Sequence, residues 1–474
     1  MTKHTKNLTI EYMDSWIDIS VPEKATVIKY GSSAFPEIPI HPEPHKAVRE
    51  ALENPIGMER IPDFVKSGSK VTIAFDDPVK KPEPIKIIIP IVIEELLQAG
   101  VIEEDITLLC ASGAHCKWRP SELKAHLGPD LYRRFRPFDW TEGRILNHDC
   151  TQGNLYLGET DLGDELEYNK AIEESDHLIY VGTVFPLPYG GYVGQGITIG
   201  LASMRALKSL HSYDIFRTLG SLHADYRPEK NLYRKHKLAA HKKIEEVTGK
   251  KIFYVDALTG PEQKIVDVFA GHVPELEKVE YPEADKYYLV KSPQVDIVIV
   301  GLPYSGMYDT SDNPGQACNI VTWPVRLWRN KPLLRENGVI IALGQCKGTT
   351  SPRRPGDPEA LRLYREYFGA KEFHDHIDSF CNNPDYLQQY RHAYAYSPIH
   401  TIFMMSNMEI LQKVSRNTIF AGEVTPGVIR EMGAIPARGF DEALSIATEI
   451  VGKDPDILVL PNYHHDPKPI FEVI

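Results

Sequence analysis

The 474-residue sequence predicts an α/β protein with two domains, each built on a mainly parallel sheet flanked by helices. Three observations support this fold class. Short apolar runs rich in β-branched residues recur along the chain, helical patterns separate them, and several runs end directly in polar or glycine-rich loops. Such alternation is typical of parallel sheets whose crossover connections are helices. At about 150 residues per domain, the length fits two or three domains.

We place the first domain at residues 1–285 and the second at residues 286–474, with the active-site cleft between them. A charged helix is predicted near the end of the first domain, and we expect His236 and His241 on it to be solvated. Another helix is predicted to end at Gly100. The predicted elements of this domain are strands at 70–75, 106–111, 177–183, 252–257 and 266–269 and helices at 84–100, 199–213 and 231–250.

The second domain is predicted to open with the strand at 295–300 (VDIVIV), after a crossover segment at 286–293. Further short apolar runs follow at 338–343, 401–405 and 456–460, and helical patterns separate them. We interpret these runs as the remaining strands of a second parallel sheet.

Composition excludes several classes of function. The net charge is −12 with no basic run, which disfavours binding to nucleic acid or to an anionic membrane. No apolar stretch reaches the roughly 18 residues of a membrane span, and the N-terminus lacks the apolar core of a signal peptide. The six cysteines are scattered without a C-x-x-C pair, so we expect reduced thiols in a cytoplasmic protein.

Polar loops follow three of the predicted strands, where ligands of open α/β sheets bind. The first carries Asp76, Asp77 and Lys81, and carboxylates or lysines there suit ribose hydroxyls or a phosphate. A polar turn is the alternative. The second carries Ser112, Gly113 and His115. Its histidine suits general acid or base chemistry, although a solvated histidine at a helix start fits equally.

The third loop spans residues 186–196 and holds four glycines in seven residues. Backbone N–H groups of Gly191 and Gly194, together with Gln195, suit a phosphate or a planar ring, while a flexible structural turn is the alternative. His211 lies near the end of the next predicted helix. Imidazole is a common ligand of late transition metals, but a lone helical histidine is more often structural.

Taken in order, these loops resemble the nickel-dependent lactate racemase family. The shared elements are D-D-x-x-[KR]-P, S-G-x-H, Asn147-His148-Asp149, Gly158-Glu159-Thr160, a V-G-x-V-x-P stretch, the glycine-rich loop and a later glutamine loop. Order and spacing match over roughly residues 40–350. The resemblance implies an isomerase of the racemase or epimerase type that acts on a 2-hydroxy acid.

The resemblance also implies a cofactor, the nickel-pincer nucleotide, and roles for individual residues. His211 matches the nickel ligand, His115 one of two catalytic histidines, and Gln316 a substrate-binding glutamine. A hydride leaves the substrate carbon to the cofactor while a histidine takes the hydroxyl proton. The residues expected to bind the cofactor are Asp76, Asp77, Lys81, Ser112, Gly113, Gly191, Gly194 and Gln195.

Three positions depart from the family pattern. Leu187 replaces the second histidine, Ile197 replaces the lysine that tethers the cofactor, and Asn319 replaces a substrate-binding lysine. We therefore predict a divergent enzyme that holds the nickel-pincer nucleotide without a covalent bond. The alternatives are a non-racemising enzyme on the same scaffold and a nucleotide-binding protein without catalysis.

Overall fold

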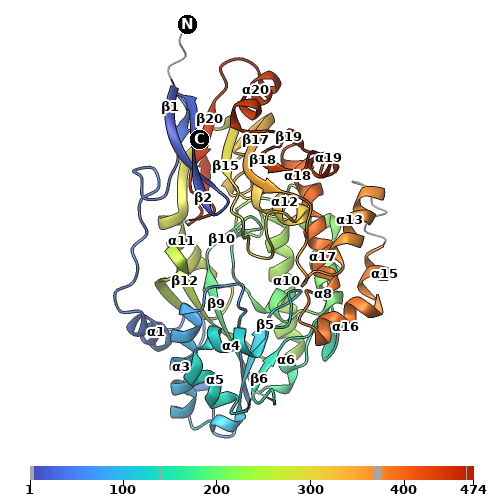
Figure 1. Cartoon of the computed structure of the whole chain (residues 1–474). Helices are drawn as coiled ribbons and strands as arrows, with labels where there is room; N and C mark the ends of the chain where they lie inside the picture. Colours follow the sequence, from blue (N-terminus) through green and yellow to red (C-terminus); the bar gives the residue numbers. More distant parts are fainter. Residues whose placement is uncertain (1–4, 139, 368–375, 466) are drawn as a thin grey trace.

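Two six-stranded sheets form the framework of the protein, which we describe from a computed structural model (Figure 1). The structure describes all residues except 1–4, 139, 368–375 and 466. One sheet has the strand order β13-β12-β9-β4-β5-β6 and the other β19-β18-β17-β15-β20-β3. All neighbours pair in parallel except β12 and β13. The predicted α/β class is therefore confirmed.

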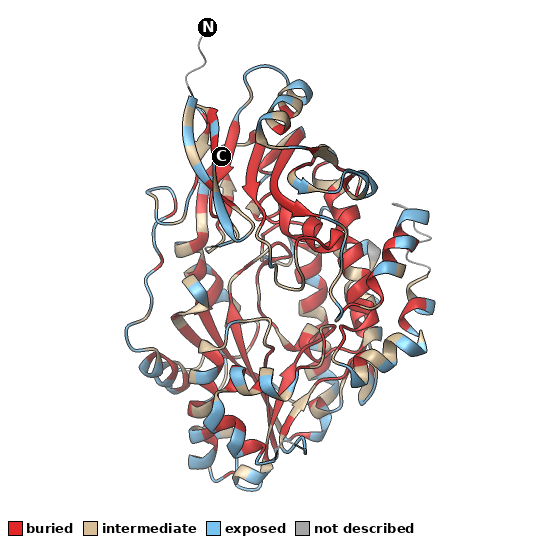
Figure 2. Ribbon diagram, in the orientation of Figure 1, coloured by how far each residue is buried: buried red, intermediate tan, exposed pale blue. Residues whose placement is uncertain are grey.

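The first sheet centres on β4 (Val71–Asp76), which pairs with β5 (Ile106–Ala111) on one side and β9 (His177–Val184) on the other. Every residue of β4 is buried, as expected for a parallel strand covered by helices on both faces (Figure 2). The remaining strands of this sheet are β6 (Ile145–Asn147), β12 (Ile252–Thr259) and β13 (Ile265–Gly271).

The helix predicted at 199–213 is broken in the structure. It forms α7 (Ile197–Gly200) and α8 (Met204–Leu210), followed by α9 (Tyr213–Phe216). The break lies at Ser203, whose hydroxyl accepts hydrogen bonds from the backbone N–H groups of Arg205 and Ala206 and so starts α8. The helices that cover the first sheet include α1 (Pro44–Glu53), α3 (Glu83–Gln98), α4 (Pro120–Leu127), α5 (Pro129–Phe135) and α10 (Leu232–Thr248).

The charged helix α10 is not a solvated helix. His236 and His241 are both buried, and His236 Nδ1 lies 2.7 Å from a carboxylate oxygen of Asp164. The prediction that these two histidines are solvated is therefore wrong. Tyr233, Ala240 and Ile244 are buried on the same helix, and its Lys237 faces the cavity described below.

The second sheet contains β15 (Val295–Gly301), β17 (Leu334–Cys346), β18 (Ile419–Val424), β19 (Ile435–Ala437) and β20 (Ile457–Leu460). Its sixth strand, β3 (Thr26–Val27), comes from the N-terminal part of the chain. The hairpin of β1 (Thr5–Tyr12) and β2 (Ser15–Pro22) buries Ile10 and Ile19 in one core with Ile297 of β15. The division into domains at residue 286 stays a prediction.

The apolar run at 401–405 is helical, so the prediction of a strand there is wrong. It lies in α17 (Pro398–Met405), which packs against α12 (Pro314–Thr322) and α13 (Asp357–Glu366). A buried helix and a buried strand are both continuously apolar, so the apolar run alone does not distinguish them. Pro398 at the first helical position favours the helix. Within the described residues, no helix has the length and apolarity to cross a membrane.

The loop after β5 depends on a glycine, which gives a stability prediction. Gly113 has φ +51°, and a Cβ there would lie 2.6 Å from the carbonyl oxygen of Ile199. Gly153, with φ +69°, has open space where its Cβ would stand. We expect Gly153→Ala to cost about 1–2 kcal/mol of unfolding free energy and Gly113→Ala about 1–3 kcal/mol more. Urea unfolding of both variants measures this; equal losses would contradict the close packing at Gly113.

Candidate functional site

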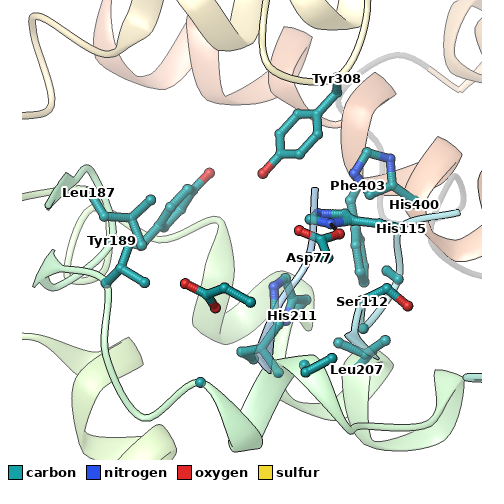
Figure 3. Close-up of a pocket in the computed structure, with 18 of the residues that line it drawn as sticks. Asp77, Ser112, His115, Leu187, Tyr189, Leu207, His211, Tyr308, His400 and Phe403 are labelled. Atoms are coloured by element: carbon teal, nitrogen blue, oxygen red, sulfur yellow. Dashed lines mark hydrogen bonds and ion pairs between the residues drawn. The ribbon is translucent and has the colours of Figure 1, made fainter. Parts of the chain in front are cut away.

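A cavity of about 230 Å³ lies where the carboxyl ends of the first sheet's strands meet α12 and the helices around α17 (Figure 3). Both halves of the chain line it, with the loops after β4, β5 and β9 on one side and residues beyond 300 on the other. The lining residues that matter chemically are Asp76, Asp77, Lys80, Ser112, His115, Tyr189, His211, Lys237, Tyr308, Asn319, His400 and Asn407.

His115 and Asp77 form a hydrogen-bonded dyad on this cavity. His115 Nδ1 lies 2.7 Å from Asp77 Oδ2, and the same carboxylate oxygen accepts a 3.1 Å hydrogen bond from Trp118 Nε1. Burial acts to raise the pKa of Asp77, but the His115 ring, Lys80 and Trp118 outweigh it and hold that pKa below its ordinary value. The carboxylate therefore holds a proton on Nδ1 and leaves Nε2 of His115 as a base.

Asp76, the neighbouring carboxylate, links two strands of the sheet. Its side chain accepts hydrogen bonds from the Tyr180 hydroxyl at 2.7 Å and from the backbone N–H and hydroxyl of Thr183 at 3.0 and 2.7 Å. These bonds join the ends of β4 and β9. Ser112 stands at the end of β5 with its hydroxyl buried and unpartnered among the described residues. It is therefore able to bond a ligand in the cavity.

His211 closes α8 and presents an unsatisfied imidazole to the cavity. Its ring stacks on Phe216 and on Phe403, with ring centroids 4.2 and 4.8 Å away. Nδ1 is buried and has no hydrogen-bond partner in the described part of the chain. Burial and the positive charges of Arg217 and Lys237 lower the pKa of His211 to about 3. A neutral, rigidly stacked imidazole with an unused nitrogen is suited to bind a metal.

His400, which the sequence reasoning missed, lies beside His115, with ring centroids 5.2 Å apart (Figure 3). It is the third residue of α17, inside the apolar run that was misassigned as a strand. Burial, Arg354 and the two histidines His115 and His211 lower the pKa of His400 well below its ordinary value. The imidazole is therefore neutral at physiological pH.

Two lysines on the cavity wall were not among the predicted site residues. Lys80 and Lys237 line the cavity, and burial lowers the pKa of each, that of Lys237 to about 7. The Lys237 ammonium donates a hydrogen bond to the carbonyl oxygen of Gly194 in the glycine-rich loop. Helical spacing from the apolar Tyr233 to Ile244 was the available signal for Lys237, because it places this lysine on the buried face.

The structure brings together part of the predicted site. Asp76, Asp77, Ser112, Gly113, His115, Gly194 and His211 all line the cavity. Lys81 does not: its side chain is exposed, and its neighbour Lys80 takes the place on the cavity wall. Gly191 and Gln195 are buried behind the wall, where the Gln195 amide donates to Glu277. Gln316 is fully buried with both amide atoms unpartnered among the described residues, but it does not line the cavity.

The three departures from the family pattern have different surroundings. Leu187 lines the cavity and lies across it from His115 in Figure 3. Asn319 also lines the cavity, and its side-chain oxygen accepts a 3.2 Å hydrogen bond from Trp323 Nε1. Ile197 is fully buried and is not part of the wall.

A metal at this site needs donors besides the protein. No group of three or more histidine, cysteine, aspartate or glutamate side chains that would hold a metal occurs among the described residues. His211 offers a buried ring nitrogen, Nδ1, that has no partner among the described residues at the wall. The donor set therefore fits a metal that a cofactor carries, with one protein ligand completing its coordination.

Comparisons with known proteins show which proteins this chain is similar to. A model described as the lactate racemase N-terminal domain matches residues 12–219. A lactate racemase from Thermoanaerobacterium thermosaccharolyticum is 24% identical over 422 residues, with 88% of each chain covered.

Solved structures agree with this fold. The lactate racemase apoprotein from the same organism matches with a TM-score of 0.72 at 22% identity, covering 98% of this chain and 100% of that one. A crystal structure of a Thermotoga maritima protein matches with a TM-score of 0.56 at 15% identity, covering 91% and 98%. The domain match over residues 12–219, the sequence relationship and the shared fold thus mark the chain as a divergent relative of lactate racemases.

Proposed function

We propose that this protein is an isomerase that inverts the configuration of a 2-hydroxy acid, using a nickel-pincer nucleotide that is not tethered to lysine. The observation that carries the proposal is the placement of the His115–Asp77 dyad and the unsatisfied imidazole of His211 on one cavity. When bound, the nucleotide supplies an electrophilic carbon that accepts hydride. The C2–H bond of a hydroxy acid can then be cleaved by hydride transfer.

The cavity wall has groups suited to each part of such a cofactor. His211 is the ligand for nickel. Burial lowers the pKa of the Lys80 and Lys237 amines on the wall, and an anionic phosphate bound beside them would favour their charged forms. The buried hydroxyl of Ser112 and the backbone beside Gly113 offer polar contacts at the end of β5. These contacts support binding without a covalent bond, since the Ile197 side chain has no nucleophile.

His115 is the base in this proposal. Its Nε2 accepts the proton of the substrate hydroxyl, and Asp77 stabilises the imidazolium that results. Leu187 is unable to move a proton, so proton transfer depends on the side of the cavity that holds His115. The same geometry supports one alternative, a non-racemising enzyme on 2-hydroxy acids, because Leu187 leaves the opposite side without a base.

The nickel content of purified protein tests the cofactor assignment. Protein from a host that makes the nickel-pincer nucleotide is expected to carry near-stoichiometric nickel with an intact mass equal to that of the bare chain under denaturing conditions. His211→Ala should reduce bound nickel by about tenfold or more, because it removes the protein's one metal ligand. Elemental analysis and mass spectrometry measure both quantities.

His392→Ala is the control, since His392 is exposed at the end of α16 (Pro384–His392), outside the cavity. It should keep the nickel. Absence of nickel in the unmutated protein from such a host would overturn the cofactor assignment, and equal nickel in the His211 variant would overturn the ligand assignment.

The dyad gives a second prediction, on catalysis. Asp77→Asn should lower kcat by about 10²–10⁴-fold with nickel content unchanged, because an amide no longer holds the proton on Nδ1 of His115. A chiral assay with lactate, malate and 2-hydroxybutyrate measures the change. Asp161→Asn, in an exposed turn, is the control and should leave kcat unaltered. Retention of full activity by Asp77→Asn would exclude His115 as the base in its proposed tautomer.

A further inference from the structure

Arg354 determines which nitrogen of His400 carries a proton. Arg354 Nη2 lies 3.2 Å from His400 Nδ1, and a guanidinium is only a donor. Nδ1 of His400 must therefore accept, which places the ring proton on Nε2. The arginine is itself immobilised: it is fully buried, lies 3.6 and 3.9 Å from carboxylate oxygens of Asp309 and Asp357, and donates to the Tyr308 carbonyl.

His400 and His115 thus carry opposite tautomers. The buried carboxylate of Asp77 keeps the proton of His115 on Nδ1, so its Nε2 is an acceptor. The buried guanidinium of Arg354 keeps the proton of His400 on Nε2, so that nitrogen is a donor. The described residues provide no hydrogen-bond partner for Nε2 of either ring. Both rings line the cavity, and their centroids are 5.2 Å apart.

An acceptor nitrogen beside a donor N–H complements a hydroxyl group in particular. A hydroxyl donates its proton to the acceptor and receives a hydrogen bond at its oxygen from the donor. We propose that His400 is a second catalytic residue, whose Nε2–H donates a hydrogen bond to the C2 oxygen of the substrate while His115 takes the proton from that oxygen. This assignment rests on the proposed function, because it presupposes a hydroxy-acid substrate.

The neutral state of His400 suits this task. As the hydroxyl proton moves to His115, negative charge develops on the oxygen, and a fixed N–H donor stabilises it without reorganising. A donor of this kind keeps its own proton, so it serves the reaction in both directions. It also explains how a site with Leu187 in place of the second histidine retains two imidazoles at the reacting oxygen.

Measuring the tautomers of His115 and His400 tests the inference without measuring catalysis. In protein labelled with ¹⁵N-histidine, the His400 ring should show a protonated Nε2 and a bare Nδ1, and the His115 ring the reverse. The His400 signals are identified by their loss in His400→Gln. Addition of pyruvate, a 2-keto acid probe, should shift the His400 Nε2 resonance. A proton on Nδ1 of His400, or an Nε2 resonance that saturating pyruvate leaves in place, would overturn the assignment.

The kinetics of the nickel-loaded enzyme give a second test of the inference. His400→Leu should lower kcat by about 10²–10³-fold with KM and nickel content little changed, as for loss of an oxyanion donor. His400→Gln should recover most of the activity, because its amide presents an oxygen to Arg354 and an N–H to the cavity. His45→Gln, at an exposed histidine, is the matched control. A purely structural role would instead reduce stability or nickel binding and would not distinguish Leu from Gln by kcat.

The NMR and kinetic tests distinguish failure of the proposed function from failure of the role of His400. An unmutated protein that lacks nickel, or that turns over none of the hydroxy acids, contradicts the proposed function, and the pyruvate titration still decides whether His400 binds a carbonyl oxygen. An active enzyme in which His400→Leu loses less than about tenfold in kcat contradicts the role of His400 alone.

Discussion

The buried carboxylate of Asp77 is the group on which the cavity depends. It lies at the end of β4, where it has little contact with water, and two neighbouring donors satisfy one of its oxygens. An unpaired carboxylate there would be strongly destabilising, so His115 and Trp118 are held in place by the same requirement that keeps Asp77 charged. The orientation of His115 is therefore a consequence of how a buried charge is compensated.

The same principle acts on the other side of the cavity with the opposite sign. Arg354 is a fully buried cation close to the carboxylates of Asp309 and Asp357, and its Nη2 donates a hydrogen bond to His400. One imidazole is thus tied to a buried anion and its neighbour to a buried cation. Because each partner allows only one tautomer, the two rings present different hydrogen-bonding faces to one ligand although their chemistry is identical.

The positions that depart from the family pattern can be compared with the charged groups on the cavity wall. The family pattern has an amine and a base where this chain has Ile197 and Leu187, and the cavity wall carries two lysines, Lys80 and Lys237, near that side. Both lie on elements other than the one that carries the family's tether. Sequence motifs follow positions along a chain, whereas a cavity only requires a charge at a point in space, so such replacements are invisible to motif comparison.

The sequence by itself determined the α/β class, most strand positions, the resemblance to lactate racemases, and the residues at strand ends such as Asp77, Ser112 and His115. The period of apolar residues and the loops that follow buried strands are local signals. Only the tertiary structure decided that Lys80 rather than Lys81 faces the cavity, that Gln316 stays behind its wall, and that His400 and Lys237 join it. Gln316, His400 and Lys237 lie on helices whose buried face depends on which distant element covers them, and that pairing is a long-range contact that no local pattern contains.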